Sequence, residues 1–352
     1  EETASIGHPE TGEVRSGWRM EIEGDLAGLS PDPRDPEVAV GYAKASIWKT
    51  VDGGRTYVDS STLFTGYAWS WWNRGAAFDR FDRNRFAFFN NDVGMTLTTT
   101  GGDYFFNRNP QAWSWYQGGL IEWIGTYAGD FQPVAGSDRM VAAVGGYFRT
   151  QLMVTDNAGA SWDLFLVDQQ EVNTTLEKHL FVAFHPGDPE FVYAGDKVST
   201  DGGLSFSFID FGSFSGQEPY LVGFCEGQPD TVYAISDNGR EIYRSDDRAE
   251  TWRLYGRPSG SMRPFDSLPT FACHPANPDI IYTLAGGGDL ASFDGDNWTN
   301  LGLIGQVAGG SQAEGYYDYV RTVTLDPNHP EILYAGMFSS GVEGAWRSTD
   351  GG

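Results

Sequence analysis

The amino-acid sequence predicts an all-β fold, made of seven copies of one four-stranded antiparallel unit. Three observations support this prediction: short runs of β-branched and aromatic residues, 46 glycines that mark frequent turns, and two motifs that recur together along the chain. The copies are spaced by roughly 40 to 55 residues, a period typical of repeat architectures. No segment shows the periodicity of an amphipathic helix.

The first motif is an apolar run, a proline turn with aspartate or histidine, and a second β run that often ends in Tyr-Ala. Short apolar runs bounded by turn residues are typical of strands, so the motif predicts two antiparallel strands. The turn histidines His185, His274 and His329 are predicted to be structural. The clear copies are Val182–Gly195, Phe271–Ala285 and Val323–Gly336, and the weaker copies are Ala27–Ala43, Ala76–Asn90, Phe131–Gly146 and Val222–Ile235.

The second motif, called here the turn signature, reads Ser/Thr-x-Asp-x-Gly-x-x-aromatic. An aspartate at the head of a hairpin turn accepts backbone N–H bonds, and glycine adopts a positive φ. Asp52, Asp201, Asp247 and Asp350 are therefore predicted to be turn caps. The copies are Thr50–Tyr57, Thr98–Phe105, Thr155–Trp162, Ser199–Phe206, Ser245–Trp252, Ser292–Trp298, which is one residue shorter, and Ser348–Gly352, which ends before its aromatic residue.

Together the two motifs provide four short strands per copy. In the fourth copy these are Phe181–Phe184, Phe191–Ala194, Lys197–Thr200 and Ser205–Ile209. Four-stranded units repeated in this way are typical of a β-propeller. We therefore predict a single domain, residues 1–352, folded as a seven-bladed β-propeller of four-stranded antiparallel blades.

The two ends of the chain are predicted to share one blade, which is the usual way in which a propeller closes its ring. The last copy supplies three strands between Val320 and Thr349, and the strand-like segment Arg15–Glu23 has no other partner. We predict that this segment is the outer strand of the last blade and that Trp18 packs beneath the Asp350 turn. The sequence leaves room for a further domain or a second propeller after Gly352.

The turn signature resembles the Asp-box, also called the bacterial neuraminidase repeat. Combined with proline turns such as "HPGDPEFVYAG", it is most similar to the propellers of glycoside hydrolase family 74, the xyloglucanase-like enzymes. Sialidases, sortilin-type receptors, a photosystem assembly factor and several propeller polysaccharide lyases are also similar, although the Arg-Ile-Pro motif of sialidases is absent. The resemblance covers nearly the whole chain, and it implies a propeller fold and a role in polysaccharide degradation.

In each predicted unit the two hairpin turns lie on one face, and the connections between units lie on the other. Long loops on a rigid scaffold are where binding residues concentrate. The connections are rich in aromatic residues, which suit stacking on sugar rings or packing against one another as small loop cores. These residues are Trp69, Trp71, Trp72, Trp113, Trp115, Tyr116, Trp123, Tyr127, Tyr316, Tyr317 and Tyr319.

The same face offers carboxylates, and glycoside hydrolysis needs two of them flanking the scissile bond. Asp92 in "NNDVG" is similar to the stretch in which the family-74 enzymes keep one catalytic aspartate, although Met95 and Thr96 depart from that pattern. Glu314 is the second catalytic candidate, whereas in that family the second carboxylate comes from a second propeller. The other acids on this face are Glu122, Asp130, Glu177, Glu218, Asp237, Asp266, Asp318 and Glu343.

Basic residues support a competing interpretation of this face. Arg74 and Arg321 take the same position in the second and seventh units, where two guanidinium groups would hold a carboxylate or sulfate. With His179 and Tyr317 as acid or base, the arrangement would resemble a polysaccharide lyase; the alternative is that these groups form surface ion pairs and packing contacts. The predicted substrate-binding residues are Trp69, Trp71, Trp72, Arg74, Trp113, Trp115, Arg149, Tyr316, Tyr319 and Arg321.

Composition narrows the classes of partner. The chain has 48 acidic and 23 basic residues, a net charge of −25, which disfavours nucleic acid or an anionic membrane as partner. No metal or cofactor motif is present, so no cofactor is expected, although the turn-face aspartates are compatible with structural calcium. Cys225 and Cys273 are too few for a disulfide framework and are expected to be small buried residues. The sequons at Asn173 and Asn297 are compatible with secretion.

These observations predict a secreted, carbohydrate-active propeller. It binds a polysaccharide or oligosaccharide on its aromatic face and cleaves it as a glycoside hydrolase would, with Asp92, Glu314, His179 and Tyr317 as catalytic candidates. The alternative is a non-catalytic binding or assembly propeller of a larger extracellular protein. A second alternative is a polysaccharide lyase that acts on uronate-containing polymers.

Overall fold

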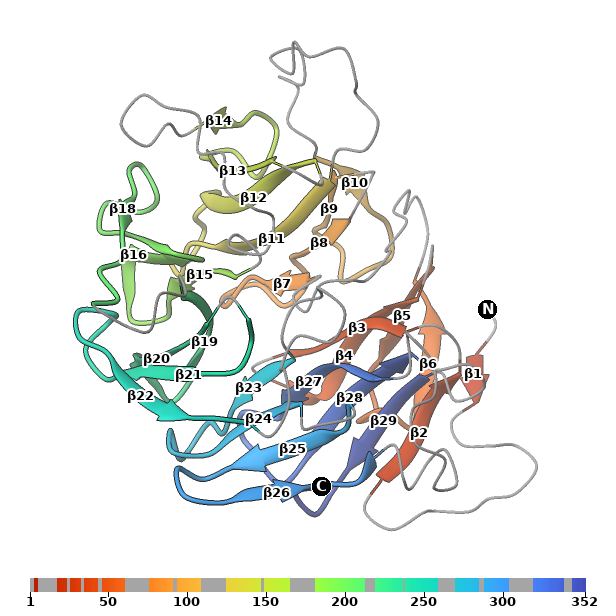
Figure 1. Cartoon of the computed structure of the whole chain (residues 1–352). Helices are drawn as coiled ribbons and strands as arrows, with labels where there is room; N and C mark the ends of the chain where they lie inside the picture. Colours follow the sequence, from red (N-terminus) through yellow and green to blue (C-terminus); the bar gives the residue numbers. More distant parts are fainter. Residues whose placement is uncertain are drawn as a thin grey trace. The chain divides into compact units, whose positions relative to one another are not determined.

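A computed structural model describes most of the chain. It covers residues 3–5, 18–23, 26–32, 35–43, 46–60, 76–90, 94–108, 125–146, 149–164, 181–212, 219–236, 238–258, 270–284, 288–303, 319–338 and 344–352. The elements in these ranges are β-strands, and they form seven antiparallel sheets (Figure 1). Within the same ranges, no helix combines the length and the apolar character needed to cross a membrane.

The chain divides into two compact units. One contains Glu1–Ala43, Ile47–Asp59 and Asp210–Gly352, and the other contains Lys44–Ser46 and Ser60–Ile209. The sheets are numbered here in chain order by their innermost strands. The first, fifth, sixth and seventh sheets belong to the first unit, and the second, third and fourth belong to the other.

Each sheet of the second unit has four strands in chain order. The second sheet consists of β7 (Ala76–Phe78), β8 (Phe86–Asn90), β9 (Gly94–Thr98) and β10 (Phe106–Asn107). The third consists of β11 (Gly125–Phe131), β12 (Met140–Gly146), β13 (Arg149–Thr155) and β14 (Asp163–Leu164). The fourth consists of β15 (Val182–His185), β16 (Asp188–Ala194), β17 (Lys197–Ser199) and β18 (Ser207–Phe208).

The fifth and sixth sheets, in the first unit, repeat this order. The fifth consists of β19 (Tyr220–Cys225), β20 (Gln228–Ile235), β21 (Ile242–Ser245) and β22 (Arg253–Gly256). The sixth consists of β23 (Phe271–Cys273), β24 (Ile281–Leu284), β25 (Leu290–Phe293) and β26 (Trp298–Asn300).

The remaining two sheets use the N-terminal segments. The seventh sheet consists of β27 (Tyr319–Leu325), β28 (Leu333–Phe338), β29 (Gly344–Ser348) and, at its outer edge, β2 (Trp18–Glu23). The register of the last pair runs from Trp18 opposite Ser348 to Glu23 opposite Gly344. This pairing lies within the segment for which the sequence predicts it; the described strand covers Trp18–Glu23, and Arg15 is outside the described residues. The packing of the Trp18 side chain is outside what the structure describes.

The first sheet departs from the four-stranded prediction. It consists of β3 (Leu26–Asp32), β4 (Asp35–Ala43), β5 (Ser46–Thr50) and β6 (Thr56–Asp59), and β1 (Thr3–Ser5) adds a fifth strand. Ala4 pairs with Tyr57 at the centre of this added edge. The prediction was wrong here because a strand of three residues has no pattern of its own and forms only where an edge offers free backbone groups.

Burial decreases from the innermost to the outermost strand of a sheet. In the fifth sheet every residue of β19 is buried, whereas β22 is exposed or half-buried. Apolar side chains of neighbouring sheets interdigitate between them, as Ile281 and Phe293 of the sixth sheet do with Tyr233 and Ile242 of the fifth. Burial on both faces explains why the inner strands read as continuous apolar runs.

Candidate functional site

The turn signatures form one recurring hydrogen-bond network, with positions counted here from the Ser or Thr as position 1. In the fourth sheet, Ser199 Oγ donates to Asp201 Oδ1 at 2.8 Å and accepts the N–H of Gly203, at position 5, at 2.9 Å. Asp201 Oδ1 also accepts the N–H of Ser205, at position 7, at 2.8 Å. The bond from the position 5 N–H to the position 1 oxygen recurs at Thr50, Thr98, Thr155, Ser245 and Ser348.

The backbone of the signature explains its glycines. Positions 4 and 5 both have positive φ in these copies; the angles are 70° and 87° at Gly202 and Gly203. Glycine adopts such angles without cost. Arg248 and Ala249 of the fifth sheet adopt φ of 60° and 72° without being glycine, so that copy bears a backbone strain of the order of 1–2 kcal/mol per residue.

The position 4 N–H ties the signature to the proline turn of the same sheet. Gly202 donates to the carbonyl of Glu190 at 2.7 Å. The equivalent bonds run from Gly53 to Glu37, Gly101 to Asn84, Ala158 to Asp138, Arg248 to Asp230 and Gly351 to Glu331. These bonds connect the two turns in six of the seven sheets. Among the described residues, the sixth sheet does not repeat the pattern.

The aspartates of the signature act as caps, as the sequence predicts. For Asp52, Asp201 and Asp247, burial acts to raise the pKa, but hydrogen bonds from the neighbouring hydroxyl and N–H groups outweigh it, and the pKa of each is lowered. Asp350 accepts a hydrogen bond from Ser348 Oγ at 2.7 Å. The carboxylates of Asp52, Asp201 and Asp247 therefore satisfy backbone donors of the turn.

Two histidines of the proline turns are also caps. His274 Nδ1 accepts the N–H groups of Ala276 and Asn277, and burial lowers its pKa, which keeps this ring neutral and accepting. His185 Nδ1 accepts the N–H of Gly187 in the same way. In the seventh sheet Asp326 takes the capping position, and His329 donates its backbone N–H to that carboxylate.

His329 instead lies 3.4 Å from Glu331 on the surface. The turn at Asp326 and the turns at His185 and His274 have the same form because any acceptor two or three residues before the N–H groups satisfies them. In all three turns the cap is the residue directly before the first proline, so Asp326 takes the position of His185 and His274.

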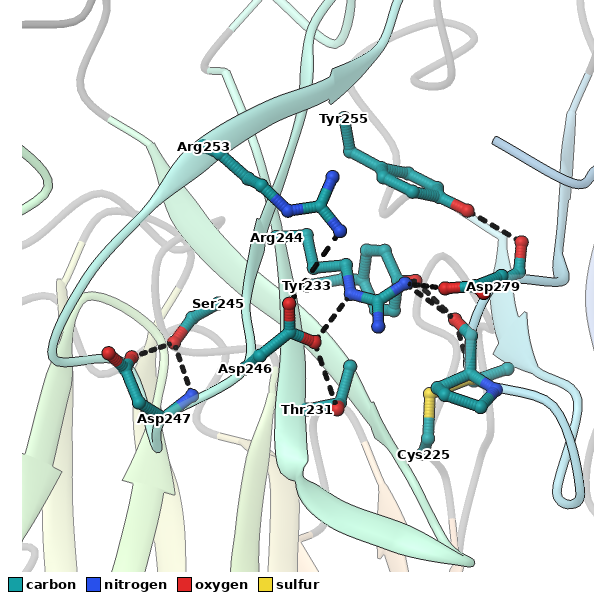
Figure 2. Close-up of polar contacts among 12 residues, drawn as sticks. Cys225, Thr231, Tyr233, Arg244, Ser245, Asp246, Asp247, Arg253, Tyr255 and Asp279 are labelled. Atoms are coloured by element: carbon teal, nitrogen blue, oxygen red, sulfur yellow. Dashed lines mark hydrogen bonds and ion pairs between the residues drawn. A yellow bond between two sulfur atoms is a disulfide. The ribbon is translucent and has the colours of Figure 1, made fainter. Parts of the chain in front are cut away.

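A polar cluster joins the fifth and sixth sheets (Figure 2). Arg244 of β21, whose side chain is 7% exposed, lies between Asp246 and Asp279. Its Nε donates to Asp246 at 2.7 Å, and its Nη1 donates to Asp279 and to the carbonyl of Pro278 at 3.4 Å. Burial acts to lower the pKa of Arg244, but the two carboxylates outweigh it and the pKa is raised.

Two tyrosines complete this cluster. The guanidinium of Arg244 stands over the rings of Tyr233 and Tyr255, 5.8 Å and 5.5 Å from their centroids. The hydroxyl of Tyr233 donates to the Pro278 carbonyl, and that of Tyr255 donates to the Asp279 carbonyl. Burial raises the pKa of both tyrosines, so they remain neutral donors. The cluster is a cross-sheet contact built from cation–π and hydrogen-bond interactions.

A disulfide between Cys225 and Cys273 lies beside this cluster and corrects the prediction of two unpaired cysteines. Cys225 ends β19 and Cys273 ends β23, so the bond joins the innermost strands of the fifth and sixth sheets. Their sequence separation of 48 hid the pairing, because only the packing of neighbouring sheets brings the two Cα atoms to 5.1 Å.

Two further buried cations lie in the second unit. Arg85 forms ion pairs with Asp79 and Asp138 and donates to the carbonyl of Ser137 at 2.7 Å, which joins the second and third sheets. Lys197 of β17 is fully buried beside the Asp196 carboxylate. Other sheets place mostly apolar or aromatic residues at the position of Lys197, namely Trp48, Thr96, Met153, Tyr243, Leu290 and Trp346.

Most predicted site residues lie outside the described residues. These are Asp92, Glu314, His179, Tyr317, Trp69, Trp71, Trp72, Arg74, Trp113, Trp115 and Tyr316. Arg149 begins β13, and Tyr319 and Arg321 lie in β27; their strands are described and their side chains are not. The structure therefore places three of these residues on strands and does not test the site.

Two residues of the predicted loop face are corrected. Tyr127 lies in β11 and is 2% exposed, so it is a core residue and not a loop aromatic. Asp130, also in β11, accepts the N–H of Phe184 at 3.0 Å and so joins the third and fourth sheets. Both were misplaced because β11 begins at Gly125, within the segment that the sequence assigns to a connection.

Sequence reasoning missed Arg244 and Arg85, which join neighbouring sheets, and Lys197, which is buried within the fourth sheet. Lys197 lies two residues before a turn signature, where the other sheets place mostly apolar or aromatic residues, and that exception is the signal that would have found it. Arg244 offers no such signal, because Lys49 and Arg347 take the same position in the first and seventh sheets. In the part of the chain that the structure describes, no group of three or more His, Cys, Asp or Glu side chains is arranged to hold a metal ion.

The chain matches no protein-family model and no curated protein. Among solved structures it is similar to YCF48 bound to a D1 peptide, with 15% identity, a TM-score of 0.58, and coverage of 98% of this chain and 99% of that one. It is also similar to the Cps50 (Swd1) β-propeller domain of Myceliophteria thermophila, with 10% identity, a TM-score of 0.59, and coverage of 95% and 98%.

A family-74 xyloglucanase from Xanthomonas campestris is similar at 16% identity and a TM-score of 0.41, over 96% of this chain and 55% of that one. A TM-score this low supports no inference about the fold or function of this chain. The two full-length similarities, at low identity, establish the fold alone: the chain has a β-propeller fold.

Proposed function

We propose that this chain is a β-propeller that binds a polysaccharide through its inter-sheet connections. One observation carries the proposal: six of the 12 tryptophans fall in two connections, from β6 to β7 and from β10 to β11. They are Trp69, Trp71, Trp72, Trp113, Trp115 and Trp123. Aromatic rings stack on sugar rings and contribute large contact areas at low entropic cost.

The opposite face supports this assignment by contrast. The turn signatures and proline turns there direct their hydroxyl, carboxylate and imidazole acceptors to their own backbone N–H groups, as at Ser199, Asp201 and His274. Such groups serve the scaffold. Function on a repeat scaffold is expected where the connecting segments vary from one unit to the next.

We also propose cleavage of the bound polymer in the manner of a glycoside hydrolase. Asp92 and Glu314 would act as the two carboxylates, one on the β8–β9 connection and the other between β26 and β27. Because the lyase alternative relies on Arg74, Arg321, His179 and Tyr317, the two reactions predict different products. Hydrolysis yields new reducing ends, and β-elimination yields unsaturated ends that absorb ultraviolet light.

A second candidate function is a non-catalytic binding or assembly propeller. The similarity to YCF48, whose structure contains a bound D1 peptide, extends over nearly the whole of both chains and favours a binding propeller. It predicts that a peptide and not a sugar is the ligand, and that the same connections hold it.

Three finer features belong to the same proposal. We propose seven blades in a closed ring, which is supported by the seven sheets and by the pairing of β2 with β29. We propose that the turn signature is an Asp-box, which is supported by its recurring hydrogen bonds. Secretion is supported by the Cys225–Cys273 disulfide, since disulfides persist in oxidising compartments.

The test is a binding screen of the whole chain against neutral and uronate-containing polysaccharides, followed by product analysis. We expect a retained polymer whose affinity falls at least about tenfold in the Trp69→Ala/Trp71→Ala/Trp72→Ala variant, as stacking contributes about 1–3 kcal/mol per ring in related contacts. Trp298→Phe is the matched control, because Trp298 stacks on Phe293 within the sixth sheet at 4.5 Å.

The outcomes separate the candidates. Retention with new reducing ends supports hydrolysis, and loss of cleavage in Asp92→Asn with retained binding assigns that residue. Retention without products supports a binding propeller. A chain that retains none of the polysaccharides, with its thermal unfolding intact, contradicts the carbohydrate proposal.

A further inference from the structure

The sixth sheet lacks the internal link that the other sheets have between their two turns. Its turn signature is one residue shorter, and Asp294 caps it by accepting the N–H groups of Asp296 at 3.0 Å and Asn297 at 2.7 Å. In the other sheets a signature N–H donates to the carbonyl of the proline turn, as Gly202 does to Glu190. Within the described residues, no signature N–H donates to the corresponding carbonyl, that of Asp279.

The fifth sheet supplies what the sixth sheet lacks. The Asp279 carbonyl accepts the hydroxyl of Tyr255, and its carboxylate accepts Arg244, both from the fifth sheet. The backbones also meet closely: a Cβ added at Gly227 would lie 1.9 Å from the carbonyl oxygen of Pro275. The proline turn of the sixth sheet is therefore held from the neighbouring sheet and not from its own signature.

The disulfide adds a covalent bond to this contact between the fifth and sixth sheets, which is called the joint here. It anchors Cys273, at the end of β23, to Cys225, at the end of β19, directly before the two proline turns that meet at Gly227 and Pro275. The polar contacts beside it involve carboxylates that are half-exposed, since the side chains of Asp246 and Asp279 are 50% and 60% exposed. Solvent weakens such pairs, so the covalent bond is the stronger restraint.

We propose that the Cys225–Cys273 disulfide is a redox-sensitive lock on the sixth sheet. When a dithiol reduces the bond, the sixth sheet loosens while the other sheets keep their internal turn-to-turn links. The compactness of this sheet thereby follows the redox state of the compartment. The proposal depends on the joint alone and is independent of the ligand that the connections bind.

The reaction is thiol–disulfide exchange with a dithiol as the reductant. A thiolate of the dithiol attacks Sγ of Cys273, which is half-buried, whereas Cys225 is fully buried. The S–S bond breaks, Cys225 leaves as a thiolate and takes a proton, and a mixed disulfide forms on Cys273. The second thiol of the dithiol then displaces Cys273, so the dithiol is oxidised by two electrons and the protein disulfide is reduced by two.

The test is hydrogen–deuterium exchange of the whole chain, measured by mass spectrometry with and without dithiothreitol. We expect exchange in β23–β26 to accelerate about tenfold or more on reduction, while β11–β16 change by less than about twofold, because local opening involves contiguous units. A Cys225→Ala/Cys273→Ala variant should show the same pattern without reductant. Uniform acceleration across all sheets, or none in β23–β26, would overturn the proposal.

A second variant tests the cause. We would replace Ser292–Trp298 by the eight-residue signature Ser199–Phe206, which restores an N–H donor for the Asp279 carbonyl. This chain should lose most of its sensitivity to dithiothreitol in β23–β26. The matched control replaces Thr98–Phe105 of the second sheet, already eight residues long and outside the joint, by the same segment, and should keep the full sensitivity. Equal sensitivity in the two chains would contradict the proposed cause.

Discussion

Gly227 and the carbonyl oxygen of Pro275 approach so closely that a Cβ on Gly227 would lie 1.9 Å from that oxygen. The neighbouring atom is backbone and belongs to a proline turn, so it has no rotamer with which to move away. This contact, with the disulfide and Arg244, defines the joint between the fifth and sixth sheets. Four predictions follow from this and related contacts.

Gly227→Ala is expected to lower the free energy of unfolding by about 3 kcal/mol, because the added methyl forces the two proline turns apart. Chemical denaturation measures the change. Gly187→Ala is the control, since its added Cβ would meet only the ring of His185 at 3.5 Å, an ordinary contact distance. The control should change stability by less than about 0.5 kcal/mol. Equal effects at the two glycines would contradict the close approach.

Arg244→Met is expected to lower the free energy of unfolding by about 1–2 kcal/mol. The guanidinium is buried, but its carboxylate partners are half-exposed and recover water when it is removed, so the cost is below that of a fully buried pair. Arg244→Lys should recover little, because an ammonium cannot bond Asp246 and Asp279 with the same fork. Arg240→Gln, at an exposed position, is the control for loss of charge. Recovery of full stability by lysine would show that charge alone matters.

The free energy of unfolding is expected to fall in acid through the turn caps. Asp52, Asp201 and Asp247 have a pKa below the ordinary 3.8 in the folded chain, so their contribution is present above pH 3.8 and is lost as the pH falls through the lowered values. Unfolding midpoints measured between pH 5 and 2 test this. Asp201→Asn should reduce the slope, while Thr200→Ser, which keeps every titratable group of the signature, should not. An unchanged slope in Asp201→Asn would contradict the assignment.

Lys197→Met is expected to destabilise the chain by about 3 kcal/mol, because it leaves the Asp196 carboxylate, 12% exposed, without its buried cation. Adding Asp196→Ser should restore much of the loss, since methionine suits a position where most other sheets place apolar or aromatic residues. The two single variants and the double variant form a thermodynamic cycle measured by denaturation. Additive losses, with no recovery in the double variant, would argue against a coupled pair.

The turn caps could be predicted because their partners are close in sequence. The acceptors Thr50, Asp52, Ser199 and Asp201 bind N–H groups at most four residues away, and a local string of residues determines such a turn. The same holds for the strands, whose apolar runs are visible in the sequence.

The cross-sheet residues could not be predicted in this way. Arg244 and Asp279 are 35 residues apart, and nothing local to either indicates the other. Asp130 was assigned to a connection because β11 begins at Gly125, within the segment that the sequence assigns to the connection. Among the catalytic and binding candidates, Arg149, Tyr319 and Arg321 are placed on strands, and the remaining ones stay predictions.

The sequence by itself determined the repeat, the all-β class and the chemistry of the turns, since each depends on residues within one strand or hairpin. Only the tertiary structure decided which sheets are joined by Cys225–Cys273, Arg244 and Gly227, and that β1 extends the first sheet. The physical reason is that these contacts depend on the packing of one sheet against the next. That packing is set by side chains buried along whole strands, and it brings together residues whose separation in the chain conveys no pattern.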